Sequence, residues 1–135
     1  MAISLYKQIL MMTRRMPVSL APPASDGAVA AFRRHCPRAP DVLYELWAIS
    51  DGMELNAPGT VLYSAGEALK EPVLGGCVPL GRMSFGDPLY LDARGQVLQI
   101  DRRNGALFQT WPTLVDFLEE ERKTAEGRGR APWAE

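Results

Sequence analysis

Three aspartates lie within seventeen residues of largely apolar sequence, in the stretch "FGDPLYLDARGQVLQID" at residues 85–101. Carboxylates at this density could bind a divalent cation or exchange protons with a substrate. Asp87, Asp92 and Asp101 lack the spacing of a calcium loop, however, and a hard cation needs several oxygens that converge on one point. Asp92 and Asp101 border the arms of an expected hairpin, where aspartate accepts hydrogen bonds from local backbone amides. The pattern therefore favours a structural role in turns.

The other groups that could do chemistry are scattered along the chain. His35, the sole histidine, adjoins Cys36, and adjacent helical residues do not face each other, so they form no base–nucleophile couple. A zinc site would need more ligands than this pair supplies, and no matching pair lies elsewhere in the chain. The segment "GGC" at residues 75–77 lacks the lysine and the helix start of a phosphate loop. Glu119 and Glu120 belong to a charged helix face rather than a glycosidase pair. We expect no metal, no cofactor and no catalytic residue.

The composition is that of a globular protein with reduced thiols. Hydrophobic residues make up 47% and charged residues 23%, the balance of a soluble domain. No apolar run approaches the ~20 residues of a membrane helix. Two cysteines without metal-type spacing suit a cytoplasmic protein, with a disulfide between them left open. The basic start "MAISLYKQILMMTRRMP" has Lys7 inside its apolar run and no small-residue cleavage site after it, which favours a first helix over a transit peptide.

Apolar periodicity and turn residues predict the elements that must position these groups. The expected helices cover residues 3–15, 26–36, 41–50 and 112–126, with one helical turn at 66–71. The expected strands cover residues 60–65, 77–83, 89–92, 97–101 and 106–110. Ser25 is placed to cap the second helix, Trp47 to pack in the core, and Pro112 to lie in the first turn of the last helix. Gly95 and Asn104-Gly105 predict two hairpin turns.

This order predicts an α+β fold, in which N-terminal helices and a C-terminal helix cover a small antiparallel sheet, a meander of about four to six strands. We expect a single domain over residues 1–135 with its core at about 26–122. An N-terminal helix and the proline-rich linker "PVSLAPPAS" would precede the core at 1–24. A flexible tail would follow it at 127–135.

The net charge of −1 conceals an acidic body between two basic ends. Residues 1–40 carry a net charge of +5, residues 41–121 of −8, and residues 122–135 of +2. An acidic body repels phosphates and attracts basic partners, although the same acids could also form a solvated face. Three arginine doublets lie on different expected elements without interleaved aromatic residues, so we expect no nucleic-acid partner.

The order of three motifs resembles that of the SUKH superfamily. The segment "APDVLYELWAISDG" resembles the family's aromatic-rich helix with its terminal Asn-Gly or Asp-Gly, although Ala39-Pro40 stands where the family has Leu-Pro. The segment "VPLGRMSFGDPLYLDARGQVLQIDRRNG" is similar to its strands, and "WPTLVDFLEEE" to its closing helix, with Thr113-Leu114 in place of Ser-Phe. The resemblance covers about residues 26–122. Within it Gly86-Asp87 marks the fold, and Pro88 predicts a strand end at an edge or bulge.

The resemblance implies a non-enzymatic binding domain. It implies a bacterial immunity protein that binds and neutralises a partner toxin, often a nuclease. The alternative it offers is a regulatory or scaffolding protein of the fungal Smi/Knr kind, which regulates cell-wall assembly without a toxin. Neither membrane nor nucleic acid is an expected partner, and the oligomeric state stays open. The residues that we expect to contact a basic partner are Asp51, Glu54, Glu67, Asp87, Tyr90, Asp92 and Asp101.

Overall fold

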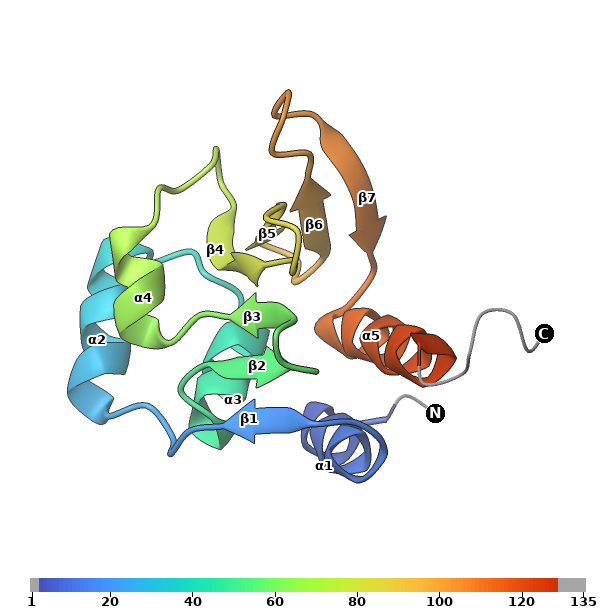
Figure 1. The fold of residues 1–135 in the computed structure, drawn as a ribbon. Helices are drawn as coiled ribbons and strands as arrows, with labels where there is room; N and C mark the ends of the chain where they lie inside the picture. The colour runs from blue at the N-terminus through green and yellow to red at the C-terminus, as the bar shows by residue number, and fades with distance from the viewer. Residues whose placement is uncertain (1–2, 129–135) are drawn as a thin grey trace.

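Five helices and seven strands follow one another in an α+β arrangement (Figure 1). The computed structural model describes residues 3–128. The helices are α1 (Leu5–Arg15), α2 (Asp26–His35), α3 (Asp41–Ile49), α4 (Ala65–Lys70) and α5 (Leu114–Arg128). The strands are β1 (Val18–Leu20), β2 (Met53–Leu55), β3 (Thr60–Leu62), β4 (Val78–Arg82), β5 (Pro88–Leu91), β6 (Val97–Ile100) and β7 (Leu107–Trp111). The predicted fold class is confirmed. The predicted tail at 127–135 falls largely outside the described residues.

The strands form one antiparallel sheet in the order of the chain, β1 to β7. The prediction of a meander is confirmed, but the sheet has more strands than the four to six expected. The two extra strands, β1 and β2, each have three residues. Strands so short contain too few positions for an alternating pattern, and β1 lies inside the predicted linker.

Residues 3–24 pack with the rest of the domain. Leu5, Ile9 and Met12 of α1 are buried, and α1 packs against α5. Val18 of β1 pairs with Leu55 of β2. Helix α1 thus adds to the core that the sequence placed at about residues 26–122, because an amphipathic helix must bury its apolar stripe against a partner, and α5 supplies that partner.

The register sorts the residues of the sheet onto two faces. Leu89 and Leu91 of β5 point into the core with Val97 of β6. The alternate position, Tyr90, is only partly buried. Pro88 is the first residue of β5, which lies between β4 and β6, so it is not at an edge of the sheet, but the β4–β5 ladder has a register shift close by, between Pro79 and Gly81. A first strand position tolerates proline because the chain enters the ladder there.

Side-chain caps begin the helices other than α3, which follows Pro40 without one. Ser25 accepts a hydrogen bond from the amide of Ala28, which confirms the predicted cap of α2. The Thr113 hydroxyl accepts the amide of Asp116, so α5 begins after Thr113 and Pro112 precedes the helix instead of lying in its first turn.

Aromatic pairs join the helices to the sheet at two places in the core. Trp47 of α3 is fully buried, as predicted, and meets Phe32 of α2 edge-to-face at 4.9 Å between ring centroids. Its indole N–H donates to the carbonyl of Tyr63 at 2.9 Å, just beyond β3. Trp111 of β7 meets Phe117 of α5 in the same way at 4.8 Å. The second contact fixes the last residue of β7 against the body of the domain.

Candidate protein-interaction surface

Strand β7 forms an edge of the sheet and is largely uncovered. It has β6 as its one neighbour in the sheet, and Figure 1 shows it running toward α5, which lies near its C-terminal end. Leu107 is 57% exposed and Phe108 is 64% exposed. An edge strand presents unpaired N–H and C=O groups, to which another strand can add. The position of β7 therefore leaves both backbone and apolar side chains accessible.

The two edges of the sheet differ in how they are protected. The opposite edge, β1, has three residues, follows Pro17 directly and is soon followed by Pro22. Such short, proline-flanked edges resist pairing with other chains. The five residues of β7, "LFQTW", include neither a charge nor a proline. The chain thus blocks one edge of the sheet and leaves the other open to a partner.

A β-bulge directs Phe108 away from the regular ladder. Gln109 pairs with Gln99, but the next pair joins Leu107 to Ile100, so Phe108 is the extra residue. Bulges bend a strand and change the direction of its side chains. Phe108 consequently helps to line a hollow of about 320 Å³ beside the β6–β7 hairpin.

This hollow lies between the turn that precedes β5 and the β6–β7 hairpin. We call the hollow and β7 together the β7 surface. Phe85, at the first of these turns, is 53% exposed and provides a second aromatic wall. The residues that line the hollow are Phe85, Asp87, Gln99, Asp101, Arg102, Arg103 and Phe108. Two of the carboxylates predicted from sequence are therefore brought together, with two arginines and two aromatic residues.

Asp87 connects the two turns through hydrogen bonds. Its Oδ1 accepts the backbone amide of Arg102 at 3.1 Å, and its Oδ2 accepts Nε2 of Gln99 at 2.8 Å. Gln99 Oε1 in turn accepts Nε2 of Gln109 on β7 at 3.0 Å. Asp87 does accept a backbone amide, as expected, but this amide is not in its own turn, which Gly86 forms with φ of 101°. Asp87 thus holds the hollow in shape.

Asp101 is engaged within the β6–β7 hairpin. Its carboxylate accepts the backbone amide of Arg103 at 2.8 Å and pairs with the Arg103 guanidinium at 3.2 Å. These hydrogen bonds lower the pKa of Asp101. The Arg102 side chain runs beside Gly86, where a Cβ would lie 3.1 Å from its Cδ. The rim of the hollow therefore carries both signs of charge.

The other predicted contacts lie elsewhere, and most stabilise local structure. Asp51 accepts the amide of Ala65 at 2.8 Å, at the start of α4. Glu67 completes a capping box with Ser64 in the same helix. Asp92 accepts two amides of the β5–β6 turn, each at 2.9 Å, as predicted for a turn aspartate.

Glu54 and Tyr90 lie on the sheet itself. The Glu54 carboxylate accepts the amide of Gly59 at 3.3 Å. Tyr90, between buried Leu89 and Leu91, is partly buried, and burial, with a smaller contribution from Glu71, raises its pKa. The seven predicted contacts are therefore divided among α4, the outer positions of the sheet, the β5–β6 turn and the hollow.

His35, Cys36 and Cys77 do not line this hollow. His35 and Cys36 line a separate hollow at the C-terminal end of α2. Cys36 and Cys77 are free thiols, and burial raises the pKa of each. Among residues 3–128, no cluster of three or more His, Cys, Asp and Glu side chains is arranged to hold a metal ion. None of the helices in that range is both long and apolar enough to cross a membrane.

Sequence reasoning missed the apolar part of the β7 surface. Phe85, Leu107 and Phe108 look like ordinary core candidates in the sequence, and their exposure depends on which strand ends the sheet. The usable signal was the missing charge and proline in "LFQTW" beside the arginine doublet Arg102-Arg103. No family model, curated protein or solved structure matches the chain.

Proposed function

We propose that this chain is a non-enzymatic protein-binding domain that neutralises a bacterial toxin in the cytoplasm by covering the toxin's working surface. The resemblance to the SUKH superfamily, seen in three ordered sequence motifs, suggests this class of function. The observation that carries the proposal is the β7 surface, where an unprotected edge strand adjoins exposed Phe85 and Phe108. Exposed apolar patches of this kind are typical of surfaces that bind other proteins.

The proposed mode of binding is addition of a partner strand to β7. Backbone hydrogen bonds along Leu107–Trp111 would provide affinity, because a strand edge offers a row of unpaired donors and acceptors. The two phenylalanines would act as anchors, since aromatic residues are common among the side chains that dominate binding energy. Arg102 and Arg103 would orient polar groups at the rim. Such a complex inhibits by occlusion and requires no chemistry from this chain.

Long-range attraction would bring a basic toxin to this surface. A carboxylate that accepts hydrogen bonds from local amides keeps its charge, so the net charge of −8 over residues 41–121 still acts at a distance. Charges outside a contact mainly change the association rate and its dependence on salt. The acidic body and the β7 surface therefore have separate proposed roles, steering and contact.

Growth rescue tests the proposal. Toxin candidates encoded beside this chain's gene would be expressed in a bacterial host, with and without the chain. The Phe108→Glu variant should lose protection, because it places a charge at the centre of the apolar contact. Tyr6→Glu is the matched control, since Tyr6 is 60% exposed but lies on α1, away from β7. Protection lost equally with both variants, or with neither, would contradict a role for the β7 surface.

Steering is tested separately by reversing three exposed acids. Glu45, Glu71 and Glu120 are exposed and lie on or beside three different helices, outside the residues that line the hollow. Changing all three to lysine should slow association roughly tenfold at low salt and leave dissociation unchanged. If the association rate is the same for the triple variant and the wild type, electrostatic steering plays no part in binding. If the wild-type chain protects against none of the toxins, the neutralising function is wrong.

A further inference from the structure

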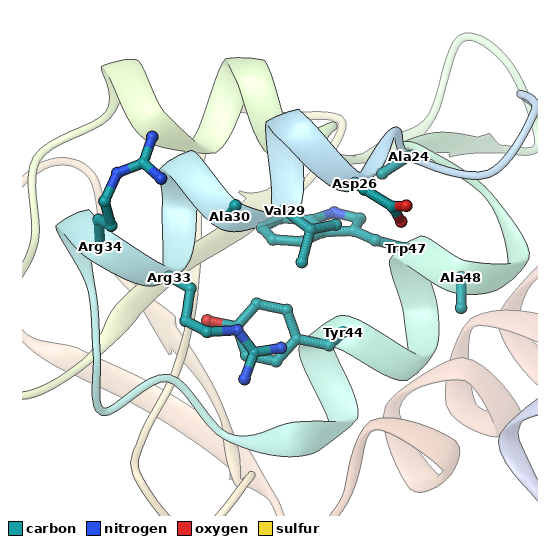
Figure 2. Close-up of a pocket in the computed structure, with 9 residues that line it drawn as sticks. All are labelled: Ala24, Asp26, Val29, Ala30, Arg33, Arg34, Tyr44, Trp47 and Ala48. Atoms are coloured by element: carbon teal, nitrogen blue, oxygen red, sulfur yellow. The ribbon is translucent and has the colours of Figure 1, made fainter.

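A groove on the opposite side of the fold from β7 runs between α2 and α3. It has a volume of about 600 Å³, and Figure 2 shows the side chains that line it. On α2 it is lined by Asp26, Val29, Ala30 and Arg33, which follow the i, i+3, i+4, i+7 spacing of one helix face, and by Arg34 at the same end as Arg33. On α3 it is lined by Tyr44, Trp47 and Ala48, again one face. Two aligned helix faces make a surface suited to a third helix.

The charges of this groove are at its two ends. Asp26 begins α2 and Arg33 lies two turns later, about 10.5 Å along the helix axis. The hydrogen bonds and ion pairs within residues 3–128 assign neither side chain an oppositely charged partner. Between them, Val29 is partly buried and Ala30 is exposed. Along its length the groove therefore has an acidic end, an apolar middle and a basic end.

Arg33 and Tyr44 mark the basic end. The Arg33 guanidinium lies over the Tyr44 ring, 4.1 Å from its centroid, and Figure 2 shows Arg33 reaching from α2 toward Tyr44 while Arg34 points away from it. The Tyr44 hydroxyl is buried and has no hydrogen-bond partner within the described range. A buried hydroxyl without a partner is unfavourable. If a partner's carboxylate bound Arg33, the guanidinium would turn toward that carboxylate. The Tyr44 hydroxyl could then donate a hydrogen bond to the same carboxylate.

We propose that this groove is a second docking site, which binds an amphipathic helix of a partner protein in the direction antiparallel to α2. The partner helix would carry Glu or Asp opposite Arg33 and Lys or Arg opposite Asp26, seven residues later, with apolar residues between them. The exposed small side chains of Ala30 and Ala48 let the helix axis approach closely. This order also favours the partner helix itself, because acids suit its N-terminal side and bases its C-terminal side.

The site is independent of the β7 surface, so the domain could hold two segments at once. Its basic end differs from the acidic body, because Arg33 and Arg34 both lie there. Groove binding of an amphipathic helix is a common way in which two proteins recognise each other.

The experiment uses the full chain and a synthetic probe. The probe is an eighteen-residue alanine-based helical peptide with Glu at position 6, Leu at positions 9 and 10, and Lys at position 13. Amide and indole NMR resonances of the chain are followed as millimolar peptide is added. We expect the resonances of Tyr44, Ala48 and the Trp47 indole to move and those of β7 to stay in place. Movement confined to β7, or no movement, overturns the proposal.

Charge compensation gives the sharper readout. Arg33→Glu should weaken binding of the probe roughly fivefold, and a peptide with Lys in place of its Glu should recover that loss. Tyr44→Phe should weaken binding by a smaller factor, since the ring remains and only the donor is removed. If Arg33→Glu leaves the dissociation constant unchanged, or if the compensating peptide recovers nothing, the proposed polarity is wrong.

Filling the groove provides a control that does not depend on charge. Ala48→Phe should reduce binding at least roughly tenfold, because the added ring occupies the space of the partner's apolar residues. Ala93→Phe is the matched control at an exposed alanine in the β5–β6 turn. Equal effects of the two variants would refute a site at the groove. So would dodecanoate that moves the groove resonances when the peptide does not, because the occupant would then be a small amphiphile.

Discussion

Replacing Asp87 with alanine tests whether one buried carboxylate holds the β7 surface together. The change removes the acceptor of two donors, Gln99 Nε2 at 2.8 Å and the Arg102 amide at 3.1 Å. Gln99 is 1% exposed, so its amide group finds no easy substitute and contributes about 2 kcal/mol to the loss. The Arg102 amide lies closer to solvent and contributes about 1 kcal/mol. We expect the free energy of unfolding to fall by about 3 kcal/mol.

The assay is urea denaturation, supported by thermal melting. A loss of this size lowers the melting temperature of a chain of 135 residues by roughly 10 °C. The denaturation midpoint should move while the slope with urea stays constant, because the native and unfolded states remain equally compact. Glu120→Ala, at an exposed position of α5, is the control and should change stability by less than about 0.5 kcal/mol.

Two further variants decide whether the network is the cause. Asp87→Asn keeps one acceptor, and the Gln99 amide can turn over because its other partner, Gln109, lies on the exposed edge strand. This variant should therefore lose about 1 kcal/mol. In a cycle with Gln99→Ala, the cost of Asp87→Ala should fall by about 2 kcal/mol. Additive effects in that cycle, or a larger loss for asparagine than for alanine, would refute the reasoning.

Three other predictions concern separate parts of the fold. Gly81→Ala should destabilise the domain by about 3 kcal/mol in urea denaturation, because its Cβ would lie 2.0 Å from the backbone oxygen of Val61 on β3, and a wild-type midpoint would contradict this. Hydrogen bonds to Arg103 lower the pKa of Asp101, so they stabilise the fold above its unfolded pKa of about 4 and are lost as pH falls through the folded pKa. Asp101→Asn should therefore flatten the loss of stability below about pH 4, as measured by melting temperature against pH. Cys36→Ser should slow thiol labelling with a chromogenic disulfide far less than Cys77→Ser, because Cys36 is the more buried thiol.

The local elements of this fold were predictable from sequence because their signals are local. The cap at Ser25 and the periodic stripe of α3 each lie within a few residues of the element they define. Gly95 and Gly105 adopt positive φ, 87° and 72°, in the two turns where such glycines were expected. Asp92 was likewise assigned correctly to a turn, since the amides it accepts are two and four residues away.

The interaction surface was not predictable because it depends on contacts distant in the sequence. Asp87 meets the amide of a residue fifteen positions later, which no local pattern reveals. The exposure of Leu107 and Phe108 follows from β7 being an edge strand with few helix contacts, and although the meander was predicted, no local pattern shows which strands the helices leave uncovered. The sequence-based prediction therefore chose contact residues by type and named mainly acids. The burial and position of the residues in the fold instead indicate exposed apolar residues as the contacts.

The aspartates of residues 85–101 support the apolar part of the β7 surface. Asp92 and Asp101 each fix a turn, and Asp87 joins the turn that carries Phe85 to the β6–β7 hairpin that carries Phe108, both of which lie outside the core. Keeping aromatic residues in water is unfavourable, so a flexible turn would fold them inward or against each other. The hydrogen bonds of Asp87 oppose that collapse, because they join the turn before β5 to the β6–β7 hairpin. Asp87→Ala should consequently weaken partner binding as well as stability, whereas Asp92→Ala, in a turn that carries neither phenylalanine, should lower stability and leave the affinity of the folded protein unchanged.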